Sequence, residues 1–353
     1  MIGSDWHYLA AVSKLRVFTL WWVLLVAFAK TCPALAQAPG PSEAPLVVAT
    51  ASIFADMAEV IGGDAIRVVS IVPLGGDPHT FEPTPAAAEL VSEADLILRN
   101  GLTFEGWLNE LIQYSGTRAP VTLVTKGITP LGSISYAGSE DPHAWMDAAN
   151  GLRYADNIYR ALAATFPEYA DQFAFNHGVY RQQIEDLHAW ILDTVQVIPK
   201  PQRVLITSHD AFQYYGQAYG LRLEAILGTS TDADAQTSDV ARVIDLITQS
   251  GVPAVFIEST VNPKLIRQIA DDTGARIGGS LFSDSLGDRY SGASTYLDML
   301  RFNTRTIVGG LAGRRSLAND GFQQDKGSIP LLVVTLLAVF AAGIAIMFFY
   351  GQE

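Results

Sequence analysis

Four side chains that lie far apart in the chain have the chemistry of a divalent-metal site. Two of them, His79 and His143, are the histidines of a repeated Asp-Pro-His triplet in a sequence with only six histidines. The other two, His209 and Asp284, each follow an apolar stretch. Three imidazoles and one carboxylate suit a tetrahedral or slightly larger transition-metal site. The residue types therefore predict metal binding by this group, called here the four candidate ligands.

The elements before the four candidate ligands explain how they could meet. Each ligand comes after a predicted strand, and open parallel sheets bind ligands just outside the carboxyl ends of their strands. Two lobes that face each other would bring two ligands from each side to one point. The predicted strands are 65–72, 121–125, 203–207 and 275–278.

Spacing alone supports the site only weakly. Successive ligands are 64, 66 and 75 positions apart, so no local metal-binding motif is present. A single loop histidine is more often a surface or capping residue than a ligand. His177 and His188 are eleven positions apart on a predicted helix, about 16 Å along its axis, and cannot share an ion.

Other residues near the predicted cleft have supporting roles in this interpretation. Glu258 ends a predicted strand and could orient a ligand from behind, although a loop or capping role is the more common one. Three aromatic side chains close to the candidate ligands could exclude water, or could simply belong to the core: Phe81, Trp145 and Phe212.

The alternation of strands and helices predicts an α/β fold with two pseudo-symmetric lobes, each a parallel sheet flanked by helices. Residues 46–166 form the predicted N-terminal lobe and residues 199–313 the C-terminal lobe. Between them, residues 167–198 contain some thirty positions without an internal proline and predict one long rigid helix. Such a helix spans about 45 Å and reaches both lobes.

The N-terminal 36 residues are typical of a signal peptide for export. Lys14 and Arg16 precede the apolar run 17–29, and the cleavage pattern Ala-Leu-Ala follows at 34–36. An uncleaved N-terminal anchor is the alternative. A lipid at Cys32, the only cysteine, is disfavoured by its preceding residues. Residues 37–45 are a linker rich in proline and alanine.

The C-terminus predicts a membrane anchor. Residues 314–328 are a polar linker, and residues 329–350 are an uninterrupted apolar stretch long enough to cross a bilayer as a transmembrane helix. The predicted protein is exported, lies on the periplasmic or extracytoplasmic face, and is anchored to the cytoplasmic membrane by this helix. The net charge of −13 argues against a nucleic-acid partner.

Five segments resemble the zinc- and manganese-binding solute-binding proteins of ABC importers, in the order found in that family. The resemblance covers residues 45–312. The segments are GDPHTFEPTP at 76–85, NGLTFEGWL at 100–108, DPHAWMD at 141–147, TSHDAFQYYGQAYGL at 207–221 and SDSL at 283–286.

The resemblance implies two lobes joined by a rigid helix, with the metal between them. It places the family's ligands on the four candidate ligands, and it implies a monomer that delivers its ion to a permease driven by a cytoplasmic ATPase. Three neutral nitrogens favour Zn(II) over Mn(II), which prefers more oxygen ligands. Against zinc alone, the loop before His143 lacks the His- and acid-rich insertion common in the family's dedicated zinc proteins, so Mn(II) stays open.

Two other functions remain at this point. A metallohydrolase would need an open coordination position and a general base. Four protein ligands leave little room for substrate, and no His-Glu-x-x-His sequence is present. The only sequence feature that supports a surface adhesin is the C-terminal apolar stretch. We therefore expect a binding protein and not an enzyme.

Overall fold

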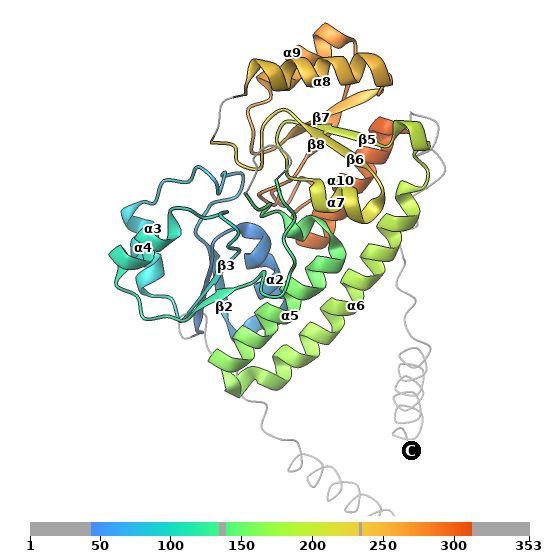
Figure 1. Cartoon of the computed structure of the whole chain (residues 1–353). Helices are drawn as coiled ribbons and strands as arrows, with labels where there is room; N and C mark the ends of the chain where they lie inside the picture. The colour runs from blue at the N-terminus through green and yellow to red at the C-terminus, as the bar shows by residue number, and fades with distance from the viewer. Residues whose placement is uncertain (1–43, 134–138, 233–234, 313–353) are drawn as a thin grey trace, which may run out of the picture.

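The computed structural model describes residues 44–133, 139–232 and 235–312 (Figure 1). The predicted signal peptide and the stretch 314–353 lie outside these ranges. We call the part from β1 to α5 the first lobe and the part from β5 to α10 the second lobe. The long helix α6 lies between them in the chain and runs along one side of the molecule (Figure 1).

The first lobe is built on a parallel four-stranded sheet with the order β2-β1-β3-β4. Successive residues of β1 point to opposite faces, and all four are buried. Val47 and Ala49 pack with α2, whereas Leu46 and Val48 pack with α3 and α4. The bounds are β1 Leu46–Ala49, α2 Ser52–Gly62, β2 Arg67–Ser70, α3 Pro85–Ser92, β3 Leu96–Arg99, α4 Leu108–Ser115 and β4 Val121–Leu123.

Helix α3 begins where its sequence predicts. The hydroxyl of Thr84 accepts the backbone N–H of Ala87, and Pro85 occupies the first turn, where its missing N–H costs no hydrogen bond. This start ends the loop that carries His79.

The second lobe contains two parallel strand pairs, β5 with β6 and β7 with β8. Strands β5 and β7 lie side by side, and the backbone N–H of His209, just after β5, donates to Glu258 at the end of β7, so both strands end near the same edge. Its bounds are β5 Val204–Thr207, α7 Gln213–Tyr219, β6 Arg222–Ala225, α8 Thr237–Ser250, β7 Ala254–Glu258, α9 Lys264–Thr273, β8 Arg276–Leu281 and α10 Tyr296–Leu311. The α/β fold with parallel sheets and flanking helices is thus as predicted.

Helix α6, Ala170–Val195, is the long helix that the sequence predicts. Its 26 residues span about 39 Å. It packs against α2 and α5 (Ala148–Thr165) of the first lobe and against α10 of the second. A short 3-10 turn at Pro167–Tyr169 precedes it, so the α-helix starts slightly later than predicted.

The predicted fold class needs one correction, because it included a C-terminal transmembrane helix. Within residues 44–133, 139–232 and 235–312, no helix is both long enough and apolar enough to cross a membrane. The longest, α6, carries charged residues along its length and buries only one stripe of apolar side chains. The stretch 329–350 lies outside the described residues.

Candidate metal centre

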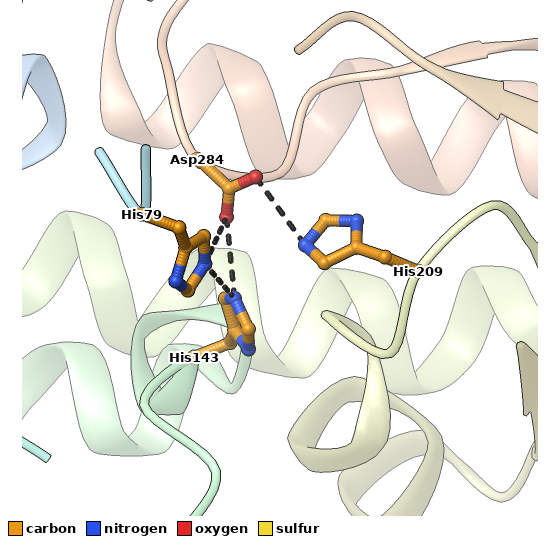
Figure 2. Close-up of side chains that lie close together, drawn as sticks. All are labelled: His79, His143, His209 and Asp284. Carbon is orange, nitrogen blue, oxygen red and sulfur yellow. Dashed lines mark hydrogen bonds and ion pairs between the residues drawn. The ribbon is translucent and has the colours of Figure 1, made fainter. Parts of the chain in front are cut away.

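The four candidate ligands converge between the two lobes (Figure 2). Each offers one ligand atom, and these atoms lie within 4.8 Å of one another. The side chains of His143, His209 and Asp284 are fully buried, and that of His79 is only 3% exposed. Residues separated by up to 205 positions (284 − 79) thus form one enclosed group.

The distances fit a small cation. Nε2 of His79 and Nε2 of His143 are 3.2 Å apart. The carboxylate of Asp284 faces both sides, with Oδ1 3.3 Å from Nε2 of His143 and Oδ2 3.3 Å from Nε2 of His209. Ligand atoms about 2.0–2.1 Å from a tetrahedral ion lie about 3.3 Å from one another. Oδ1 of Asp284 is 4.0 Å from Nε2 of His79, the longest of these four separations.

Unpaired buried atoms support the same interpretation. Nε2 of His209 and Oδ1 of Asp284 are buried and have no partner with hydrogen-bond geometry among the described residues. Buried polar atoms in proteins are nearly always satisfied. A cation between the three imidazoles and the carboxylate would satisfy both atoms at once.

Both first-lobe ligands are held by the same local turn. The backbone N–H of His79 donates to Oδ1 of Asp77 at 2.9 Å, and the backbone N–H of His143 donates to Oδ1 of Asp141 at 2.9 Å. An aspartate two residues before the donor forms this turn readily, and the intervening proline restricts it. The repeated triplet therefore presents each imidazole in a fixed direction.

Carboxylates stand behind two of the imidazoles. Nδ1 of His143 is hydrogen-bonded to Oδ1 of Asp141 at 2.7 Å. Nδ1 of His209 lies 2.7 Å from Oε2 of Glu258, whose Oε1 accepts the backbone N–H of His209 at 2.8 Å. Such partners fix the ring orientation and direct Nε2 toward the site. Glu258, for which the sequence favoured a loop or capping role, therefore stands behind His209.

The second-lobe carboxylate is oriented by hydroxyl groups. Oδ2 of Asp284 accepts a hydrogen bond from Oγ1 of Thr260 at 2.9 Å and from Oγ of Ser283 at 3.0 Å. The indole Nε1 of Trp145 donates to the carbonyl oxygen of Ser283 at 3.0 Å. This contact joins the segment after His143 to the segment that carries Asp284.

The imidazoles differ in their affinity for protons. Burial lowers the pKa of His79 to about 3. Burial also opposes protonation of His143, but the hydrogen bond and charge of Asp141, with Asp284, outweigh it and raise the pKa to about 9. For His209, Glu258 and Asp284 outweigh burial and raise the pKa well above its ordinary value.

The pKa of Asp284 is shifted in the opposite direction. Burial raises it, but the nearby His209 and His143 outweigh burial and hold the pKa well below the usual range. The carboxylate is therefore ionised and ready to bind a cation. Protons on His143 and His209 balance its charge, and an arriving cation would displace them.

Aromatic rings enclose the first-lobe ligands. The ring of Phe104 lies edge-on to His79, with centroids 4.9 Å apart, and that of Trp145 lies 5.3 Å from His143. Of the three predicted aromatic residues, Trp145 is at the site. Phe81 packs on Trp107 instead, and Phe212 is in the core.

Sequence reasoning missed three residues that contact the candidate ligands. Asp141 and Phe104 stand within the quoted segments, but nothing local shows that they contact an imidazole. The repeated triplet was a signal for Asp141, because both copies carry an aspartate at the same offset. Thr260 is brought to Asp284 only by the tertiary fold. Outside the site, His177 pairs with Asp156.

Fold and site together define a class: two-lobed α/β proteins with a buried group of three histidines and one aspartate between the lobes. The family model described as the zinc-uptake complex component A, periplasmic, matches residues 47–310. The chain belongs to this family.

Individual relatives agree with this assignment. The manganese-binding lipoprotein MntA of Halalkalibacterium halodurans is 35% identical over 75% of this chain and 88% of its own length. The manganese ABC transporter substrate-binding lipoprotein PsaA of Streptococcus pneumoniae is 32% identical over 75% of this chain and 89% of its own. Among solved structures, the periplasmic zinc-binding protein TroA of Treponema pallidum superposes with a TM-score of 0.73 at 32% identity, covering 76% of this chain and all of that one.

Proposed function

We propose that this protein is the extracytoplasmic receptor of an ABC importer for a divalent metal ion. It captures the ion with His79, His143, His209 and Asp284 and passes it to a membrane permease driven by a cytoplasmic ATPase. One observation carries the proposal: four buried ligand atoms from both lobes lie within 4.8 Å of one another. The family supports the transport role, since relatives are named as substrate-binding components of metal ABC transporters.

Zn(II) and Mn(II) are the candidate cargo ions. Manganese appears in the names of the relatives MntA and PsaA, and zinc in that of TroA. Three imidazole nitrogens favour zinc, and the general order of divalent-ion affinity places Zn(II) above Mn(II). Manganese binding is favoured by Asp284, whose two oxygens both face the other ligands and could both coordinate the ion. We infer that zinc binds more tightly than manganese in direct competition.

Receptors, not enzymes, make up the family to which the chain belongs. The metallohydrolase alternative therefore falls away. Its chemistry would also require a coordination position open to substrate, which a site enclosed by Phe104, Trp145 and four protein ligands does not offer.

The proposal is tested by metal analysis of His209→Ala beside a matched control, His177→Ala. His209 is fully buried at the site, whereas His177, on α6, contacts Asp156 and Tyr159 of α5. We expect one zinc ion per chain in the wild type and in His177→Ala, and a much weaker affinity in His209→Ala. Equal metal content and affinity in all three proteins would refute the site.

A further inference from the structure

Two hydroxyl groups of the second lobe reach across to the two Asp-Pro-His loops of the first. Oγ1 of Thr231, in the segment after β6, donates a short hydrogen bond to Oδ2 of Asp77. The hydroxyl of Tyr214, on α7, donates to the backbone carbonyl of Asp141 at 3.0 Å. Each of these contacts lies two residues before a first-lobe ligand.

The hydroxyl of Tyr214 makes two hydrogen bonds to the first lobe. Its hydroxyl also accepts the backbone N–H of Leu131 at 2.9 Å, and the N–H of Asp141 bonds the carbonyl of Leu131 at 2.8 Å. Tyr214 is 4% exposed, so this hydroxyl leaves water when it makes the two bonds. A single second-lobe side chain thus holds both ends of the loop that leads to His143.

The Thr231 contact acts on a charged group. Oδ1 of Asp77 is already used by the turn at His79, which leaves Oδ2 for the other lobe. Hydrogen bonds to a carboxylate are stronger than those between neutral groups. On the same side, the backbone N–H of Gly75 donates to Oγ of Ser285 at 2.8 Å, so the His79 loop meets the second lobe at two places.

These two contacts are separate from metal coordination. The candidate ligands would hold an ion through Nε2 atoms and a carboxylate, whereas the hydroxyl groups of Thr231 and Tyr214 hydrogen-bond to atoms of the loops that carry two of these ligands. Breaking either hydrogen bond removes none of the candidate ligand atoms. It removes a bond that keeps a first-lobe ligand close to His209 and Asp284.

We propose that Thr231 and Tyr214 are positioning residues that clasp the lobes together and set how slowly the bound ion is released. The proposal rests on the proposed metal-receptor function. Release requires the lobes to separate, and separation breaks both hydrogen bonds. Each clasp therefore lengthens the residence time of the ion until contact with the permease supplies a competing interaction.

The test measures the rate of zinc release from the full-length protein into an excess of chelator by stopped flow. Thr231→Val removes the hydroxyl while keeping the shape of the side chain, and Tyr214→Phe does the same. We expect release to be about tenfold faster in Thr231→Val and about fivefold faster in Tyr214→Phe, as expected for the loss of a hydrogen bond to a charged and to a neutral acceptor.

Two further variants separate a clasp from general damage. Thr231→Ser keeps the hydroxyl and should release zinc at nearly the wild-type rate. Thr248→Val, on the exposed side of α8, removes a threonine hydroxyl far from the cleft and should have no effect. The clasp also predicts that zinc association is not slowed in any variant, whereas a distorted site would bind zinc more slowly.

The outcomes distinguish this proposal from the proposed function. One zinc ion per chain, with release rates in Thr231→Val and Tyr214→Phe within twofold of the wild type, would refute the clasp and leave the receptor intact. Failure of the wild type to bind zinc or manganese would overturn both. Faster release in the two variants with rescue by Thr231→Ser supports the clasp.

Discussion

The two Asp-Pro-His loops share a sequence and a turn but differ in electrostatics. In both, the histidine N–H bonds the aspartate, and the proline carbonyl accepts a first-lobe side chain, Trp107 for Pro78 and Asn100 for Pro142. Yet the pKa is about 3 for His79 and about 9 for His143. The same triplet therefore fixes direction, while residues from elsewhere decide proton affinity.

The difference originates in the second contact that each aspartate makes, beyond its hydrogen bond to the histidine N–H. Asp141 contacts the imidazole of its own triplet, through Nδ1 of His143. Asp77 turns its free oxygen to Thr231 in the second lobe. One triplet thus supplies a ligand backed by a carboxylate, and the other supplies a neutral ligand together with a contact between the lobes.

The largest effect is expected from the ligands themselves. Both His79→Ala and His143→Ala should lose more affinity for zinc than the roughly 10–100-fold typical of losing a partner behind a ligand. His143→Ala should also lower stability more than His79→Ala does, by about 3 kcal/mol, because it leaves the buried carboxylate of Asp141 without its imidazole. Titration calorimetry and denaturant unfolding measure the two quantities. Equal loss of stability in both variants would contradict the comparison.

A smaller effect separates the two aspartates. Asp141→Asn keeps the Oδ1 that accepts the N–H of His143 but removes the negative charge beside Nδ1. We expect zinc affinity to fall about 10–100-fold, because the imidazole becomes less basic. Asp77→Asn is the matched control and should change the equilibrium affinity by less, since Asp77 contacts no imidazole nitrogen in the described structure. A larger loss in Asp77→Asn would reverse the assignment.

The pH dependence of zinc binding sharpens the comparison further. His143 and His209 hold protons at neutral pH in the metal-free protein, whereas His79, with a pKa of about 3, does not. An ion must displace those two protons, so affinity falls as pH falls, with a slope of about two log units per pH unit near pH 7. Above pH 9 the contribution of His143 to the slope should disappear. Calorimetry in buffers of different ionisation enthalpy counts the protons directly.

A release of no protons at pH 7 would contradict the pKa assignments. In Asp141→Asn the count should fall toward one, because His143 loses the carboxylate that raises its pKa. Asp77→Asn should still release about two protons.

The smallest effects are expected at the bonds to the two proline carbonyls. Trp107→Phe removes one hydrogen bond at a partly buried position and should cost about 1 kcal/mol of unfolding free energy. Asn100→Ala should cost more, because its buried amide joins Pro142 to the hydroxyl of Tyr154. Thermal denaturation of both variants gives the order. A greater loss of stability in Trp107→Phe than in Asn100→Ala would contradict this order and would mean that the His79 loop is held more firmly than the His143 loop.

Much of the fold follows from patterns within short segments. Strand β1 is a continuous apolar run, and α3 starts at Thr84-Pro85. Helix α6 follows from a long stretch without proline after Pro167. These signals are local and could be read directly. The predicted transmembrane helix is not found among the described residues. The bounds of the lobes remain a prediction.

The candidate site was predictable only in part. His79, His143, His209 and Asp284 could be chosen because each follows a strand in a parallel sheet, and the structure brings them together. The contacts of Thr260, Thr231 and Tyr214 could not, because they depend on the angle at which the lobes meet. No local sequence pattern encodes that angle, since it depends on contacts between elements far apart in the chain, such as those of α6 with α2, α5 and α10.

The central claim is that the four candidate ligands form one divalent-metal site. Its most direct test is metal analysis of the purified protein after loading with zinc, beside the same protein carrying His209→Ala and Asp284→Ala together. We predict one zinc ion per wild-type chain and none retained by the double variant after dialysis. Retention of one ion by the double variant, or no zinc in the wild type, would contradict the claim.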